Sequence, residues 1–109
     1  MTTITIYKSD NNLYKGFTCK GHAGFANSGK DIVCASVSVL VINTLNSMDE
    51  LVHEEMDVKS DENTGYIECR FPKEISEQSK LLMDSMILGL TDIVNLYGKK
   101  YLKLRFEEV

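Results

Sequence analysis

The residues whose side chains could most readily take part in a reaction are Cys34 and His22. They lie twelve positions apart, and His22 belongs to a glycine-rich segment. A thiolate can attack an amide carbonyl, and an imidazole can take the thiol proton and later donate it to a leaving amine, because it titrates near neutral pH. Each residue alone has an ordinary interpretation, since free cysteines are usually buried and loop histidines usually make structural hydrogen bonds. Together they predict a nucleophile, Cys34, and a general base, His22.

Two polar residues near Cys34 are candidates for accessory roles. If Asp31 is the N-cap of a helix, Cys34 lies in the first helical turn, where exposed N–H groups would stabilise a thiolate and an oxyanion. Asp31 would then contribute about 1 kcal/mol as a cap; the alternative is that it orients His22. Ser38 lies one turn after Cys34, within reach of the thiolate, although serine hydroxyls more often bond back to their own helix.

Residues 21–30 predict a loop between an extended segment and that helix. Gly21, Gly24 and Gly29 permit positive φ and cheap changes of shape, and Phe25 is the one large apolar residue among them. Such a loop can close over an extended peptide and exclude water. The alternative is a surface loop with no gating role.

The other two cysteines have the pattern of packing residues. Cys19 and Cys69 fall on the apolar faces of alternating segments. The chain has no Cys-x-x-Cys or His-x-x-x-His spacing and no phosphate-binding glycine motif. We therefore expect no metal ion and no cofactor.

Hydrophobic periodicity predicts the elements that position these residues. Alternation predicts strands, and a 3.6-residue period predicts helices. The strands are expected at residues 2–8, 13–20, 56–60, 66–71 and 102–106, and the helices at residues 31–52 and 72–97. Pro72 suits a first helical turn and Gly98 a helix end. A buried strand at residues 32–42 is the competing interpretation, because that segment is rich in β-branched residues.

The expected element order is strand–strand–helix–strand–strand–helix–strand. Helices packed on one face of a sheet give such an order a single core. The sequence therefore predicts a small two-layer α+β sandwich with a mostly antiparallel sheet and both helices on one face. Its 109 residues indicate one domain, residues 1–109, with a small core that a partner subunit would help to complete.

Composition narrows the functional class. The 43% hydrophobic and 26% charged residues are typical of a globular domain, and a net charge of −4 argues against direct nucleic-acid binding. We find no apolar stretch that we expect to cross a membrane and no basic–apolar start typical of a signal peptide. An odd number of cysteines, three, is consistent with free thiols in a cytoplasmic protein.

The chain resembles the ribosomal-processing cysteine protease family Prp, also called YsxB-like, in two motifs. They are Gly21-His22-Ala23, followed by Gly29 after a short variable segment, and Asp31-Ile32-Val33-Cys34-Ala35, followed by Ser38. Length and element order agree as well, so the resemblance covers essentially the whole chain. Ser36 stands where relatives often have alanine or glycine.

The resemblance implies a homodimeric α+β endopeptidase of the cytoplasm. Its substrate would be the precursor of the twenty-seventh large-subunit ribosomal protein, whose short N-terminal extension must be removed for ribosome maturation. The catalytic residues would be His22 and Cys34, with Asp31 and Ser38 as accessory positions. The glycine-flanked loop at residues 21–30 would be the mobile substrate loop.

Two other functions remain open from the residues themselves. A non-catalytic ribosome-assembly module would bind a ribosomal protein and keep Cys34 buried and inert. A thiol-based redox or acyl-transfer protein is the third possibility, although no second cysteine stands at the close spacing that redox exchange usually needs.

Overall fold

The computed structural model describes the backbone of residues 1–21 and 28–109, and the side chains of residues 1–21 and 32–109. The strands are β1 (Thr2–Lys8), β2 (Tyr14–Lys20), β3 (Asp57–Asp61), β4 (Tyr66–Arg70) and β5 (Leu102–Glu108). The helices are α1 (Ser28–Ser47), which continues as a short π-helix, η1 (Met48–Val52), and α2 (Glu77–Tyr97). This is the element order that the sequence predicts.

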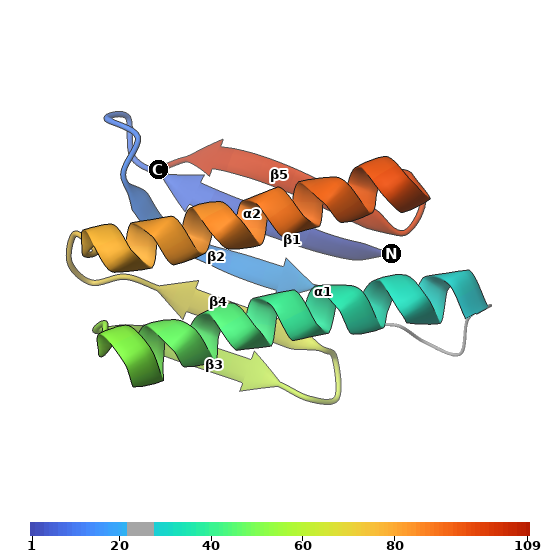
Figure 1. Cartoon of the computed structure of the whole chain (residues 1–109), viewed down its shortest axis with the longest axis horizontal. Helices are drawn as coiled ribbons and strands as arrows, with labels where there is room; N and C mark the ends of the chain where they lie inside the picture. The colour runs from blue at the N-terminus through green and yellow to red at the C-terminus, as the bar shows by residue number, and fades with distance from the viewer. Residues whose placement is uncertain (22–27) are drawn as a thin grey trace.

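The five strands form one sheet in the order β3-β4-β2-β1-β5. Strands β1 and β5 are parallel, whereas the other three neighbouring pairs are antiparallel. Figure 1 shows α1 and α2 lying side by side over the same face of the sheet. The predicted two-layer α+β sandwich is therefore confirmed.

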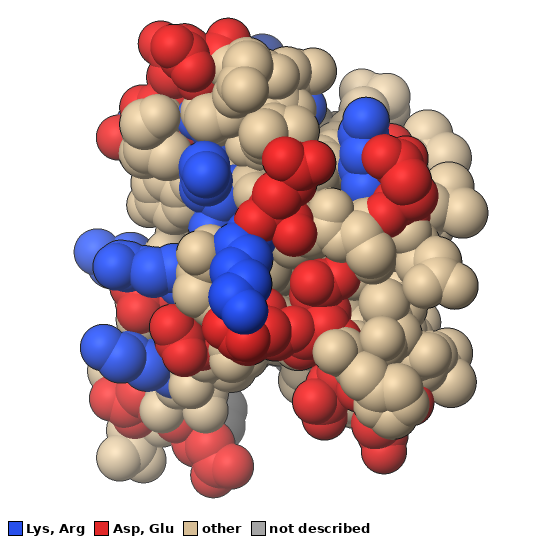
Figure 2. Space-filling view, turned by 90° about the vertical axis from the view of Figure 1, so that its left-hand side faces the viewer, with Lys and Arg blue, Asp and Glu red and all other residues tan. Residues whose placement is uncertain are grey.

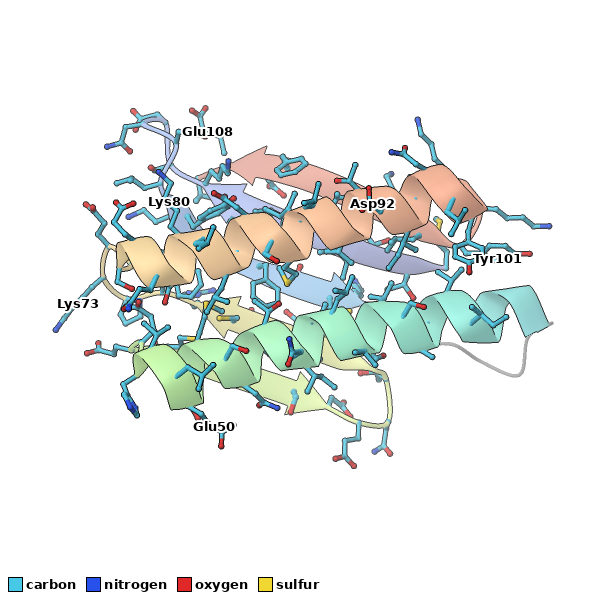
Figure 3. The ribbon with its side chains drawn as sticks, viewed as in Figure 1. Glu50, Lys73, Lys80, Asp92, Tyr101 and Glu108 are labelled. Carbon is cyan, nitrogen blue, oxygen red and sulfur yellow. The ribbon has the colours of Figure 1, made fainter. Side chains whose placement is uncertain are left out.

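The core lies between the sheet and the two helices. In β1, Ile4 and Ile6 pair with Cys19 and Phe17 of β2, so the apolar side chains of both strands point to one face. Buried residues from every element except β3 complete this layer, among them Cys69, Leu102, Val33, Val37, Val41, Met83, Met86 and Leu90. In Figure 3 the labelled charged residues Glu50, Lys73 and Asp92 point away from this core.

Helix α1 begins earlier than the sequence predicts. Its first residue is Ser28, so Asp31 lies inside the first turn and is not the N-cap, and residues 28–30 are helical instead of part of a loop. Serine and aspartate are both common at helix starts, so the choice between them has little local basis. The alternative of a strand at residues 32–42 is wrong.

Helix α2 begins later than predicted. Ser76 is its N-cap and accepts a hydrogen bond from the Ser79 amide at 3.2 Å, so Pro72 precedes the helix and is not in its first turn. Glu54, just after η1, accepts hydrogen bonds from both the amide and the hydroxyl of Ser76, at 3.1 and 2.9 Å. Gly98, with φ of 84°, ends the helix as predicted.

One segment of α1 and η1, Ile32–Val52, is long and apolar enough to cross a membrane by length and composition. We expected no such stretch from the sequence, and by this measure of length and composition that expectation is wrong. Core helices of soluble proteins pass the same test. Here Val33, Val37 and Val41 are buried against the sheet and α2, which accounts for the apolar inner side of the helix.

Candidate active site

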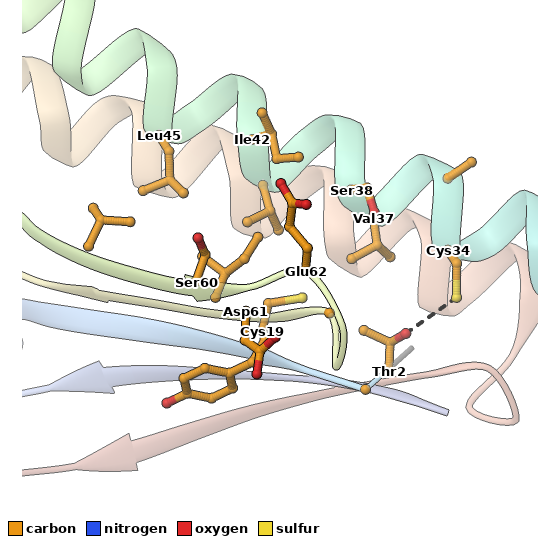
Figure 4. A pocket seen from close by; sticks show the side chains of 17 residues that line it. Thr2, Cys19, Cys34, Val37, Ser38, Ile42, Leu45, Ser60, Asp61 and Glu62 are labelled. Carbon is orange, nitrogen blue, oxygen red and sulfur yellow. Dashed lines mark hydrogen bonds between the residues drawn. The ribbon is translucent and has the colours of Figure 1, made fainter. Parts of the chain in front are cut away.

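A groove with a volume of about 630 Å³ runs between α1 and the β3–β4 hairpin. Figure 4 shows Cys34 toward one end and Leu45 toward the other. Its apolar lining comes from Val37, Val41, Ile42, Leu45, Val58 and Ile67. The hairpin adds a polar wall with two carboxylates, Asp61 and Glu62. The groove therefore offers a long apolar surface with a thiol at one end and acidic groups beside it.

Cys34 is held in this groove by the second turn of α1. The residue is only 8% exposed, but it lines the groove, and its Sγ lies 3.4 Å from the hydroxyl of Thr2. Because Cys34 follows the first helical residue, Ser28, by six positions, its N–H is not among the four free N–H groups at the helix start. The predicted placement in the first turn is wrong, and with it the argument that those groups stabilise a thiolate or an oxyanion.

The other two cysteines, Cys19 and Cys69, are core residues whose thiols have raised pKa values. Burial, with a smaller contribution from the nearby Cys34, raises the pKa of Cys19 to about 11. Burial, with a smaller contribution from Asp57, raises the pKa of Cys69 to about 12. Both belong to the hydrophobic core, as expected for packing residues. Neither is an accessible thiolate at neutral pH.

Several of the sequence-predicted site residues fall in the described part of the chain. Gly21 and Ser38 line the same groove as Cys34. The φ of Gly21 is 106°, and a Cβ there would overlap the carbonyl oxygen of Met1, so only glycine fits where the end of β2 meets the start of β1. Gly29 lies in α1 and not in a loop.

The remaining predicted residues lie outside what the structure describes. His22, Gly24 and Phe25 are not among the described residues, and the backbone of Asp31 is described but its side chain is not. The pairing of His22 with Cys34 and the role of Asp31 therefore remain predictions. Among the residues whose side chains are described, no three His, Cys, Asp or Glu come together to hold a metal ion.

Thr2 and the hairpin carboxylates Asp61 and Glu62 line the groove but were not predicted from the sequence. The signal for Thr2 was its place two residues before Ile4, on the face of β1 that points to the helices. That alternation says which face a residue occupies, but not which helical residue lies opposite. The two carboxylates lie between residues 56–60 and 66–71, the segments expected to be strands, and no role was expected for them.

Comparison with known proteins finds relatives that match almost the whole chain. A family model described as cysteine protease Prp matches residues 1–103. The ribosomal processing cysteine protease Prp of Bacillus subtilis is 33% identical over 97 residues, which cover 85% of this chain and 87% of that protein. Its namesake from Staphylococcus aureus is 27% identical over 99 residues, covering 91% and 93%.

Solved structures agree in fold. The crystal structure of the S. aureus protease Prp with a covalently linked product peptide has a TM-score of 0.87 and 26% identity, and covers 98% of this chain and 100% of that one. The same enzyme with a substrate peptide has a TM-score of 0.90 at 24% identity, with the same coverage. This chain belongs to the Prp family of cysteine proteases.

Proposed function

We propose that this chain is an endopeptidase that removes the N-terminal extension of the twenty-seventh large-subunit ribosomal protein, with Cys34 as nucleophile and His22 as general base and acid. The observation that carries the proposal is the position of Cys34, whose sulfur lines a long apolar groove and has a hydroxyl as its neighbour. Cys19 also lines this groove, but it belongs to the hydrophobic core, and the pKa of its thiol is raised.

The proposed reaction has two steps. His22 takes the thiol proton, the Cys34 thiolate attacks the scissile carbonyl carbon, and His22 then donates that proton to the leaving amine. The result is a thioester between Cys34 and the new carboxyl end of the extension. Water, deprotonated by His22, then hydrolyses the thioester and frees the thiol. The complex of a relative, S. aureus Prp, with a covalently linked product peptide supports a covalent route.

The dimensions of the groove suit an extended peptide. Cys34 and Leu45 lie eleven residues apart on α1, or about 16 Å at the rise of an α-helix. An extended chain advances about 3.3 Å per residue, so the groove accommodates about five substrate residues. The apolar lining favours large apolar side chains within that stretch. Ser38, which lines the groove one turn after Cys34, is proposed as a contact to the substrate or to the thiolate.

The identity of the substrate rests on the relatives and on charge. The curated relatives are named as ribosomal processing proteases. A basic ribosomal protein would be attracted to a chain of net charge −4. On the face that Figure 2 shows, basic and acidic side chains are interspersed. We infer recognition of the protein substrate without direct contact to nucleic acid.

We further propose a cytoplasmic homodimer. None of the three cysteines is in a disulfide, as in proteins of reducing compartments. Large apolar side chains remain exposed on the outer sides of both helices, with Val39 67%, Leu88 65% and Leu96 75% exposed. A second copy packed on these helices would remove them from water. Sedimentation analysis at micromolar concentration tests this, and a monomer would contradict it.

The activity is tested by incubating the protein with the extended ribosomal precursor. We expect a single cut near the precursor's N-terminus, read by intact mass. Cys34→Ala and His22→Ala should abolish the cut, whereas Cys19→Ala, a change at a buried thiol of the same groove, should keep it. A Cys34→Ala protein that cleaves the precursor as fast as wild type would overturn the mechanism. Binding without cleavage by the wild type would favour the assembly module.

A further inference from the structure

The hydroxyl of Thr2 lies 3.4 Å from the sulfur of Cys34, within hydrogen-bond distance for sulfur (Figure 4). The two residues are 32 positions apart in the sequence and meet only because the start of β1 passes beneath α1. Both are buried, with exposures of 3% and 8%. Among the described side chains, Thr2 is the residue that hydrogen-bonds to this sulfur.

The backbone holds Thr2 firmly in this position. Its amide donates to the carbonyl of Tyr101 at 3.1 Å, and it pairs with Leu102, which is fully buried on β5. On its other side, Gly21 lets the end of β2 approach Met1 closely. A threonine in a strand also has few side-chain rotamers. The hydroxyl is therefore presented to the sulfur by a rigid part of the sheet.

The contact changes character when the sulfur loses its proton. In the thiol form either group can donate, whereas a thiolate can only accept, so the Thr2 hydroxyl must then be the donor. Hydrogen bonds to charged groups are stronger than those between neutral groups, so this contact favours the thiolate. It matters here because Cys34 lies beyond the free N–H groups at the start of α1.

We propose that Thr2 is a positioning residue for the nucleophile: its hydroxyl donates a hydrogen bond to the Cys34 thiolate and directs the sulfur into the groove. The inference rests on the proposed role of Cys34 as nucleophile. It assigns to β1 a part in the site, whose other described lining residues lie on α1, at the end of β2 and on the β3–β4 hairpin.

The test compares Thr2→Val, which keeps the shape and removes the hydroxyl, with Thr2→Ser, which keeps the hydroxyl. Thr5→Val is the matched control, since Thr5 is also a buried threonine of β1 but points to the opposite face of the sheet. For each folded protein, the rate of Cys34 alkylation by iodoacetamide is measured from pH 5 to 10, together with kcat and KM for the extended precursor.

For Thr2→Val we expect the midpoint of the alkylation profile to move up by about one pH unit and kcat near neutral pH to fall by about tenfold, with KM little changed. Thr2→Ser and Thr5→Val should stay close to wild type in both measurements. A purely structural Thr2 would lower thermal stability without moving the alkylation midpoint. An unshifted midpoint in Thr2→Val overturns the proposal.

Two further outcomes separate this inference from the proposed function. If Thr2→Val does not fold, Thr2→Ala and Thr2→Ser are compared in its place, and equal midpoints in these two variants overturn the role of the hydroxyl. If wild type fails to cut the precursor while its midpoint still depends on Thr2, the endopeptidase assignment fails and the contact stands. If wild type cuts the precursor but the alkylation midpoint does not depend on Thr2, the endopeptidase assignment stands and the role of Thr2 fails.

Discussion

The three thiols should differ sharply in their reaction with iodoacetamide at pH 8. Only the thiolate reacts, and burial raises the pKa of Cys19 from 9.0 to about 11 and that of Cys69 from 9.0 to about 12. A thiol with a pKa of 9.0 is about 10% ionised at pH 8, against about 0.1% for Cys19 and about 0.01% for Cys69. Ionisation alone thus slows Cys19 about 100-fold and Cys69 about 1000-fold relative to the unfolded chain. We expect Cys34 to be labelled first.

Trypsin makes the assay direct, because it leaves each cysteine on a different peptide: residues 16–20, 31–59 and 60–70. The native and the urea-unfolded protein are labelled for increasing times at pH 8, digested, and compared by mass spectrometry. Cys34→Ser serves as the control and should take up almost no label while folded. The reasoning from burial would be refuted if Cys19 in the folded protein reacted as fast as Cys34. It would also be refuted if Cys19 reacted as fast in the folded protein as in the unfolded chain.

Three further predictions address the groove, the strand ends and the helix cap. Ile42→Asp places a charge in the apolar groove and should raise KM about tenfold, whereas Leu51→Asp, at an exposed position of η1 outside the groove, should not. Gly21→Ala should lower the free energy of unfolding, measured with urea, by about 2 kcal/mol and should reduce cleavage, since its Cβ would overlap Met1. Gly98→Ala, with free space around its Cβ, should lower the same free energy by about 1 kcal/mol and leave cleavage intact. Glu54→Ala should lower the free energy of unfolding by about 1 kcal/mol at pH 7, because it removes hydrogen bonds at the start of α2. That loss should vanish in acid, and an equal loss at pH 3 would contradict the role of the carboxylate.

The sign of the acid effect follows from the pKa of Glu54. Burial alone would raise this pKa, but the neighbouring Ser79 and the two donors of Ser76 outweigh it and lower the pKa below its usual 4.5. A carboxyl group whose pKa is lower in the folded state stabilises the fold above the unfolded-state pKa. That contribution is lost as the pH falls through the folded-state pKa.

Local patterns in the sequence were enough to predict most of the fold. The alternation of Ile4 and Ile6 and the helical stripe through Met86 and Leu90 depend only on neighbouring residues, because each face of a strand or helix has to be apolar where it meets the core. Boundaries were less certain. Ser28 and Asp31 are both suitable near a helix start, and the structure begins α1 at the earlier one.

Sequence reasoning alone predicted which residue types carry the chemistry: a cysteine in an apolar helix and, before it, a histidine in a glycine-rich segment. The tertiary structure decided what surrounds the thiol. Only the place of β1 between β2 and β5 brings Thr2 to Cys34, and only the packing of the β3–β4 hairpin beside α1 makes the groove. The physical reason is that periodicity reports the face on which a residue lies, whereas the residue opposite depends on strand order and register, which no local pattern encodes.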